Sequence, residues 1–212
     1  MTTAATVVFV VAALFAVGNW IAVARAQRAF EYVCKPATLL ALVVVALLLD
    51  AENDAQRWWF VAALAFSLLG DVLLMLPSDR FVAGLGAFLV AHLCYIPGLL
   101  LDRPTTAAVG VATVVVVTLV GPVARVVLRR VRASATPELA VPVGAYIVVI
   151  AVMVVAALAS GDARAAVGAA LFAGSDSMIA WNRFVRPFAG ARVAIMVTYH
   201  LGQAGLVVSL LS

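Results

Sequence analysis

Two apolar stretches of this sequence each carry one aspartate: FSLLGDVLLML (66–76), which contains Asp71, and AALFAGSDSMIAW (169–181), which contains Asp176. Most residues around the two aspartates are apolar, as in helices that face lipid. An aspartate at membrane depth costs several kcal/mol unless it is paired or faces a cavity. Asp71 and Asp176 are therefore candidate functional residues, and their similar surroundings suggest one shared site.

The composition predicts a polytopic membrane protein. The 212 residues are 66% hydrophobic and only 11% charged, with a mean hydropathy of +1.17. A soluble domain of this length could not hide so much apolar surface. The net charge of +4 comes from basic residues dispersed among short loops, which indicates membrane orientation and not nucleic-acid binding. Cys34 and Cys94 are expected to be free thiols.

Apolar runs of about 20 residues, the length that spans a bilayer, predict an all-α bundle of eight transmembrane helices in a single domain, 1–212. The second helix is predicted to be short and to open at Lys35-Pro36, because proline is tolerated at a helix start. The N-terminal segment has no basic region before its apolar run, so it is interpreted as the first span and not as a signal peptide. The predicted spans are 4–24, 35–50, 57–76, 81–101, 105–128, 138–159, 163–182 and 190–211.

The basic residues predict the orientation. The connections after the odd-numbered helices hold eleven of them: Arg25, Arg28, Lys35, Arg80, Arg125, Arg129, Arg130, Arg132, Arg183, Arg186 and Arg192. The other connections hold three: Arg57, Arg103 and Arg164. The positive-inside rule then places the first set in the cytoplasm and both termini outside, with the plasma membrane as the expected location.

This topology predicts where the polar groups gather. Asp71 and Asp176 would each lie about five residues before a cytoplasmic helix end, which is about 8 Å at 1.5 Å per residue. Asn19 would occupy the same place in the first helix. Further polar side chains come early or midway in the outward-running helices, which predicts a cavity that opens toward the cytoplasm: Lys35, His92, Tyr95, Tyr146, Tyr199, His200 and Gln203.

A weak internal repeat supports a shared site. Asp71 and Asp176 are 105 positions apart, and His92 and His200 are 108 apart. The offset is typical of a four-helix unit used twice in the same orientation, which would bring the aspartates to equivalent places.

Two carboxylates close together in a low-dielectric site cannot both stay ionised easily, so the pair would hold a proton and provide an acid beside a base. The alternatives are that each aspartate only packs helices together, or that one pairs with Lys35. Lys35 could instead reach toward the headgroups or contact a lipid phosphate. The sequence has no HxH, HxxxH or HExxH spacing, so neither a metal nor a cofactor is expected. Small residues near the aspartates are expected to allow close helix packing.

At these residues the chain resembles the lysoplasmalogenase (YhhN-like) membrane family. The pieces that resemble it occur in the family's order along nearly the whole chain, and the last has His200 where the family pattern has tyrosine. They are CKPATLL (34–40), FSLLGDVLLML (66–76), FVAGLGAFLVAHLCYI (81–96), VPVGAYIVVIAVM (141–153), GAALFAGSDSMIAWNRF (168–184) and TYHLGQAGL (198–206).

The resemblance implies eight spans and hydrolysis of the vinyl-ether bond of a lysoplasmalogen, which releases a fatty aldehyde and glycerophosphoethanolamine or glycerophosphocholine. Asp71 and Asp176 would be catalytic and membrane lipids the surroundings. The implied supporting residues are Lys35, His92, Tyr95, Tyr146, Ser175, Tyr199 and Gln203. A protonated aspartate would protonate the vinyl ether while the other stabilises the cation, with the roles interchangeable at this stage.

Two other function classes fit parts of the sequence. A four-plus-four repeat with intramembrane carboxylates would suit a proton-coupled carrier, although carriers usually have broken helices and polar groups toward both faces. A lipid hydrolase for esters or amides would need a nucleophile, and no GxSxG elbow is present. The natural lipid and the oligomeric state are left open.

Overall fold

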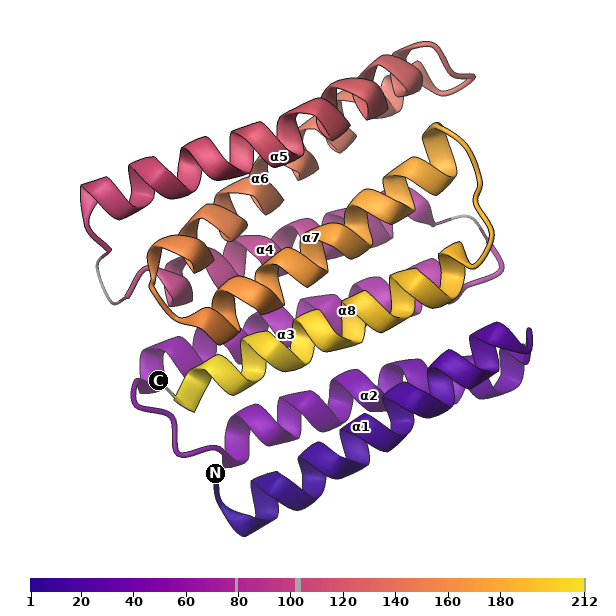
Figure 1. Ribbon diagram of the computed structural model, residues 1–212. Helices are drawn as coiled ribbons and strands as arrows, with labels where there is room; N and C mark the ends of the chain where they lie inside the picture. Colours follow the sequence, from indigo (N-terminus) through magenta and orange to yellow (C-terminus); the bar gives the residue numbers. More distant parts are fainter. Residues whose placement is uncertain (79, 102–103, 212) are drawn as a thin grey trace.

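The computed structural model of the chain describes residues 1–78, 80–101 and 104–211. Within these ranges the chain forms eight long helices that run up and down in turn, with both termini at the same end of the bundle (Figure 1). The helices are α1 (Thr3–Ala24), α2 (Arg28–Leu48), α3 (Asp54–Met75), α4 (Phe81–Leu99), α5 (Thr106–Arg132), α6 (Ala140–Ala159), α7 (Ala163–Phe184) and α8 (Ala191–Val208), with short 3₁₀ turns η1 (Pro137–Leu139) and η2 (Ser209–Leu211).

The all-α membrane fold is confirmed. Seven helices of the described ranges are long and apolar enough to cross a membrane. The eighth, α7, has 22 residues, which is a spanning length, but its glycines, serines and charged residues lower its mean hydropathy. The predicted start of α2 is wrong. That helix begins at Arg28, so Lys35 and Pro36 lie inside it. Residues 28–34 are already helical. Proline is favoured at the start of a helix, but it does not have to stand there.

The helix starts differ between the two ends of the bundle. Each odd-numbered helix begins with a side chain that accepts backbone N–H groups: Thr2, Asn53, Thr105 and Asp162. Such caps satisfy amides that have no partner within the helix. The even-numbered helices begin at the basic end without a side-chain cap.

Glycines let α7 and α8 approach until their backbones touch. A Cβ built on Gly202 would lie 2.8 Å from the Phe172 nitrogen and 2.9 Å from the Gly168 oxygen. A Cβ on Gly168 would lie 2.7 Å from the Leu206 nitrogen. Small residues at a helix contact are the usual means of close packing in membranes. The contact fixes the register of α7, which carries Asp176, against α8, which carries Tyr199.

Helix packing in the second half of the chain follows that in the first. α2 packs on α3 and α8, and α6, four helices later, packs on α7 and α4. This is the pattern of a four-helix unit used twice. The hydrogen bond from the Tyr95 hydroxyl to Gln203 Oε1 (2.6 Å) joins two positions 108 apart, the same offset that relates His92 to His200. The outer helices differ, because α1 packs on α8 whereas the second neighbour of α5 is α7.

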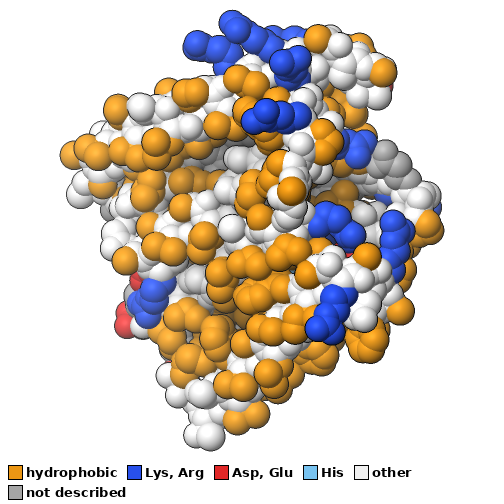
Figure 2. Space-filling view, turned by 45° about the vertical axis from the view of Figure 1, so that its right-hand side comes forward, with side chains coloured by type: hydrophobic (Ala, Val, Ile, Leu, Met, Phe, Trp, Pro, Cys, Tyr) orange, Lys and Arg blue, Asp and Glu red, His pale blue; other side chains and the backbone are white. Residues whose placement is uncertain are grey.

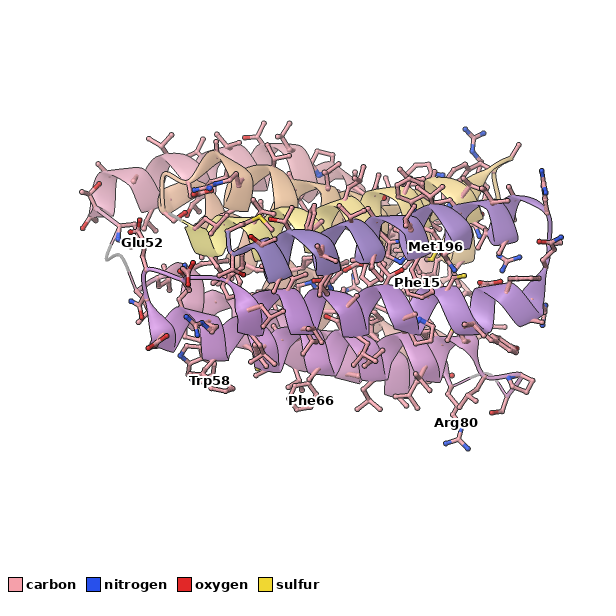
Figure 3. The ribbon with its side chains drawn as sticks, turned by 90° about the horizontal axis from the view of Figure 1, so that it is seen from below. Phe15, Glu52, Trp58, Phe66, Arg80 and Met196 are labelled. Atoms are coloured by element: carbon pink, nitrogen blue, oxygen red, sulfur yellow. The ribbon has the colours of Figure 1, made fainter. Side chains whose placement is uncertain are left out.

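The surface matches a membrane environment. Large apolar side chains such as Leu14, Leu119 and Val141 are exposed along the outside of the bundle, and a surface of this kind in a single chain marks contact with lipid or protein. Arginines gather toward the top and right of the face in Figure 2. Glu52 and Arg80 lie at opposite ends of the bundle (Figure 3).

We expect Gly202→Ala to lower the melting temperature of the protein in detergent, because the new methyl would meet backbone atoms that cannot move independently. Overpacking of this kind costs about 1–3 kcal/mol. Gly174→Ala in α7 is the matched control, since a Cβ there meets nothing within 4 Å and alanine favours the helix. Equal melting temperatures for the two variants would contradict the backbone contact.

Candidate active site

Asp71 is held by side chains from two other helices. Lys35 of α2 places its Nζ 2.9 Å from Asp71 Oδ1, and the Tyr199 hydroxyl of α8 donates to Oδ2 at 2.8 Å. The Asp71 side chain is 1% exposed and that of Lys35 7%. A buried ion pair of this geometry keeps both charges compensated. Of the alternatives for Lys35, the structure shows contact with an aspartate.

Asp176 has different partners. The Tyr146 hydroxyl of α6 donates to Asp176 Oδ2 at 2.5 Å. His92 Nε2 of α4 lies 3.7 Å from the same oxygen. The Asp176 side chain is 13% exposed. Unlike Asp71, this carboxyl group has no lysine or arginine partner among the described residues.

The ring of His92 is oriented by a backbone contact. Nδ1 lies 2.5 Å from the Phe88 carbonyl oxygen. A carbonyl can only accept a hydrogen bond, so Nδ1 carries the proton and Nε2 of the neutral ring presents a lone pair. That lone pair is turned to Asp176. The separation of 3.7 Å exceeds hydrogen-bond distance, so His92 and Asp176 are neighbours without a hydrogen bond between them.

The two aspartates occupy equivalent places in the two halves. Asp71 is contacted from α2 and α8, and Asp176 from α6 and α4, which are the corresponding helices of the repeat. Within the described residues, the recorded polar contacts of the two carboxylates have no side chain in common.

Phe172 connects the two sides: its ring centroid lies 5.3 Å from that of Tyr199 and 4.7 Å from that of His92. The aspartates lie at different distances from the ends of their helices. Asp71 is four residues before Met75, the last residue of α3, whereas Asp176 is eight residues before Phe184, the last residue of α7.

An apolar groove passes beside Asp176 and not beside Asp71. Its walls come from α3 to α7, and its volume is about 70 Å³. Phe88, Val123, Ile147 and Ile150 are among its apolar lining residues. The polar groups on its walls come from Tyr146, Asp176 and Ser177. A hydrocarbon chain in this groove would therefore lie next to one carboxyl group.

The other predicted residues have no recorded hydrogen bond or ion pair with the two carboxylates. Tyr95 bonds Gln203, which is one helical turn from Tyr199. The Ser175 hydroxyl donates to the Ile195 carbonyl and links α7 to α8, as expected for a packing residue. Asn19 is fully buried, and neither polar atom of its side chain has a partner among the described residues. Asn19 therefore has no recorded hydrogen bond to either aspartate.

His200 and its partner show what sequence reasoning missed. Trp20 of α1 donates its indole N–H to His200 Nδ1 at 3.0 Å, so His200 packs α8 against α1. A lone tryptophan in an apolar helix gives no signal of such a bond. The groove itself was also missed, because its lining is ordinary aliphatic sequence in α5 and α6.

Both cysteines are free, as predicted. The part of the chain that the structure describes has no group of three His, Cys, Asp or Glu side chains placed to hold a metal.

Comparison with known proteins places the chain in a family. Residues 30–210 match the YhhN family. A lysoplasmalogenase of Mycobacterium bovis is 40% identical over 167 residues, which cover 76% of this chain and 61% of that protein. Human lysoplasmalogenase TMEM86B is 34% identical over 158 residues, which cover 70% of this chain and 62% of that protein.

A third relative, an uncharacterized Escherichia coli membrane protein named YhhN, is 42% identical over 65 residues, which cover 31% of each chain. No solved structure matches. The chain spans about three-fifths of the length of the mycobacterial and human relatives, at 61% and 62%. The family match extends over most of the helical bundle and includes both aspartates, and on this ground the chain belongs to the YhhN family.

Proposed function

We propose that this protein is a membrane-embedded lipid hydrolase that cleaves the vinyl-ether bond of lysoplasmalogens. One observation carries the proposal: Asp176, a carboxyl group without a cationic partner among the described residues, forms part of the wall of an apolar groove. A single long chain with a reactive bond near its polar end fits such a groove. The names of the mycobacterial and human relatives support the same reaction.

In the proposed mechanism, protonated Asp176 delivers its proton to the vinyl carbon remote from the ether oxygen. The C=C electron pair forms the new C–H bond and an oxocarbenium ion results. Water adds to the cationic carbon and gives its proton to the Asp176 carboxylate, which restores the acid. The hemiacetal then breaks its C–O bond, releasing aldehyde and the glycerol hydroxyl. One carboxyl group acts first as acid and then as base.

Neighbouring side chains support these steps. Tyr146 donates to Oδ2, so it stabilises the carboxylate once the proton has left and leaves Oδ1 for the substrate. The recorded contacts of Asp176 all involve Oδ2. The lone pair of His92 Nε2 lies 3.7 Å from the same oxygen, and we assign it the role of accepting a proton from that oxygen.

Asp71 has a different role in this proposal. Its charge is compensated by Lys35, and it is absent from the groove wall. It is a positioning residue, because its carboxylate holds Tyr199, whose ring packs on Phe172 beside His92.

We expect purified protein to release fatty aldehyde from a lysoplasmalogen, and Asp176→Asn to lower the rate by about 10²–10⁴-fold, the usual contribution of a general acid. The variant should keep the wild-type melting temperature within a few degrees, because the amide can still accept from Tyr146. Aldehyde is measured by mass spectrometry. A saturated ether analogue serves as the control, since it has no vinyl carbon to protonate. Wild-type turnover by Asp176→Asn would exclude the mechanism. Transport of the lipid without product would instead favour a carrier.

Variants of the Lys35–Asp71 ion pair can separate the roles of the two aspartates. We expect Lys35→Met alone to be strongly destabilising, by about 3–5 kcal/mol, because it leaves a buried carboxylate without its counter-charge. Lys35→Met with Asp71→Asn should recover most of the melting temperature and retain measurable aldehyde release, well above that of Asp176→Asn. A stable double variant as inactive as Asp176→Asn would show that Asp71 takes part directly in the chemistry.

We also propose that the basic end of the bundle faces the cytoplasm of a plasma membrane. Lys35 is buried and does not contribute to the charge of that end, and Arg103 lies outside the described residues. The exposed arginines that remain still favour this orientation. The polar site would then lie nearer the cytoplasmic side.

This orientation predicts opposite labelling of two single-cysteine variants, each with Cys34 and Cys94 replaced by alanine. In intact cells, an impermeant maleimide should label Glu52→Cys and should label Arg80→Cys only after permeabilisation. The two positions are exposed at opposite ends of the bundle. The reverse pattern would invert the topology.

A further inference from the structure

The apolar groove beside Asp176 has one polar side chain on its wall that is not engaged with another residue. The polar groups of the wall come from Tyr146, Asp176 and Ser177. The Tyr146 hydroxyl donates its hydrogen to Asp176 Oδ2, so these two groups are bonded to each other. Ser177 has no recorded hydrogen bond to any residue that the structure describes. Its hydroxyl can therefore bond a molecule in the groove.

Helix geometry directs Ser177 toward the groove. Four α7 residues on the groove wall are spaced by three or four positions, as on one face of a helix: Ala173, Ser177, Ala180 and Phe184. Ser175 lies about 200° from Ser177 around the helix, at 3.6 residues per turn. There its hydroxyl donates to the Ile195 carbonyl of α8. The two serines that flank Asp176 thus differ: Ser175 packs α7 against α8, and Ser177 lines the groove.

The Ser177 hydroxyl also lacks a bond that other hydroxyls inside these helices make. Thr38, Thr113 and Thr198 each donate to the carbonyl four residues earlier. Within the described ranges no such bond is recorded for Ser177. Asp176 does not replace it, because adjacent side chains of a helix point about 100° apart and do not face each other. A small molecule in the groove can bond both of them.

The proposed reaction needs such a molecule. Hydrolysis requires a water next to the cationic carbon, whereas nearly all of the groove wall is apolar. A buried water is held by about two to four polar partners, and an apolar cavity without them stays dry. Asp176 Oδ1, which has no recorded contact within the described residues, is one such partner. Ser177 Oγ provides the second on the same wall.

We propose that Ser177 holds the attacking water beside Asp176. This inference rests on the proposed function. The water donates one hydrogen to Asp176 Oδ1 and the other to Ser177 Oγ, which leaves a lone pair for the cationic carbon. As this lone pair forms the new C–O bond, one O–H bond of the water breaks and its proton passes to Oδ1. The second hydrogen stays on the hemiacetal hydroxyl. Ser177 is a positioning residue, because it acts through the water.

Hydrogen exchange into the substrate tests this role separately from the overall rate. When the water is misplaced, the oxocarbenium ion more often returns a proton to Asp176, which re-forms the vinyl ether. In deuterium oxide, a return that removes the original hydrogen leaves deuterium on the vinyl carbon. We expect Ser177→Ala to raise the deuterium content of lipid recovered at half conversion about fivefold or more over wild type, as for loss of one hydrogen bond. Mass spectrometry of the recovered lipid measures it.

Two variants separate hydrogen bonding from shape and packing. Ser177→Cys keeps the shape of the side chain but carries a thiol, a weak hydrogen-bonding group, so it should exchange deuterium as Ser177→Ala does. Ser175→Ala removes the hydroxyl that packs α7 on α8 and should leave the exchange at the wild-type level. In calorimetry, the saturated ether analogue should bind Ser177→Ala and wild type with equal affinity, because Ser177 bonds the water and not the lipid.

Four results would overturn the inference. Wild-type exchange by Ser177→Ala would show that capture of water does not need Ser177. Wild-type exchange by Ser177→Cys would assign the effect to shape. Equal increases in Ser175→Ala and Ser177→Ala would assign it to the packing of α7. Weaker binding of the analogue to Ser177→Ala would place the lipid on the hydroxyl.

Aldehyde release by the wild type separates this inference from the proposed function. Release together with any of these four results would leave the vinyl-ether reaction standing and remove only the role of Ser177. A wild type that neither releases aldehyde nor exchanges deuterium would remove the reaction, and the inference with it.

Discussion

The structure depends on the need to compensate two carboxylates inside a bundle whose outside is apolar. A buried aspartate is tolerated only when other side chains supply charge or hydrogen bonds. For Asp71 these come from α2 and α8, and for Asp176 from α6 and α4. Each aspartate therefore joins its own helix to the preceding helix and to one more distant in the chain, and these contacts lie at corresponding places in the two halves.

The two sites have the same framework and different chemistry. Lysine next to Asp71 makes a compensated ion pair that is closed to the groove. Asp176 is instead contacted by a tyrosine and a histidine and has no lysine or arginine partner among the described residues. The outer helices add to this difference, because α1 packs on α8 whereas α5 packs on α7 and, with α4, lines a groove. Corresponding places in the two halves thus hold one carboxylate paired with a lysine and one that lies on the wall of an apolar groove.

Sequence reasoning predicted much of the fold, because span length and apolar runs depend on local properties. The helices agree with the predicted ranges to within a few residues except α2, where a preference of proline was given more weight than the helical residues before it. Most of the predicted polar residues do contact the aspartates or each other. Asn19 and Ser175 do not contact either aspartate, since depth in the membrane says nothing about which way a side chain points.

The sequence by itself determined that this is a helical membrane protein with two aspartates that need partners, because hydropathy and charge cost are properties of each segment alone. Only the tertiary structure decided which partner each one has. That choice depends on contacts between residues far apart in the sequence, since Tyr146 meets Asp176 and Tyr199 meets Asp71 across separations of 30 and 128 residues. The groove follows from the same packing, since aliphatic residues carry no local sign of the space they enclose.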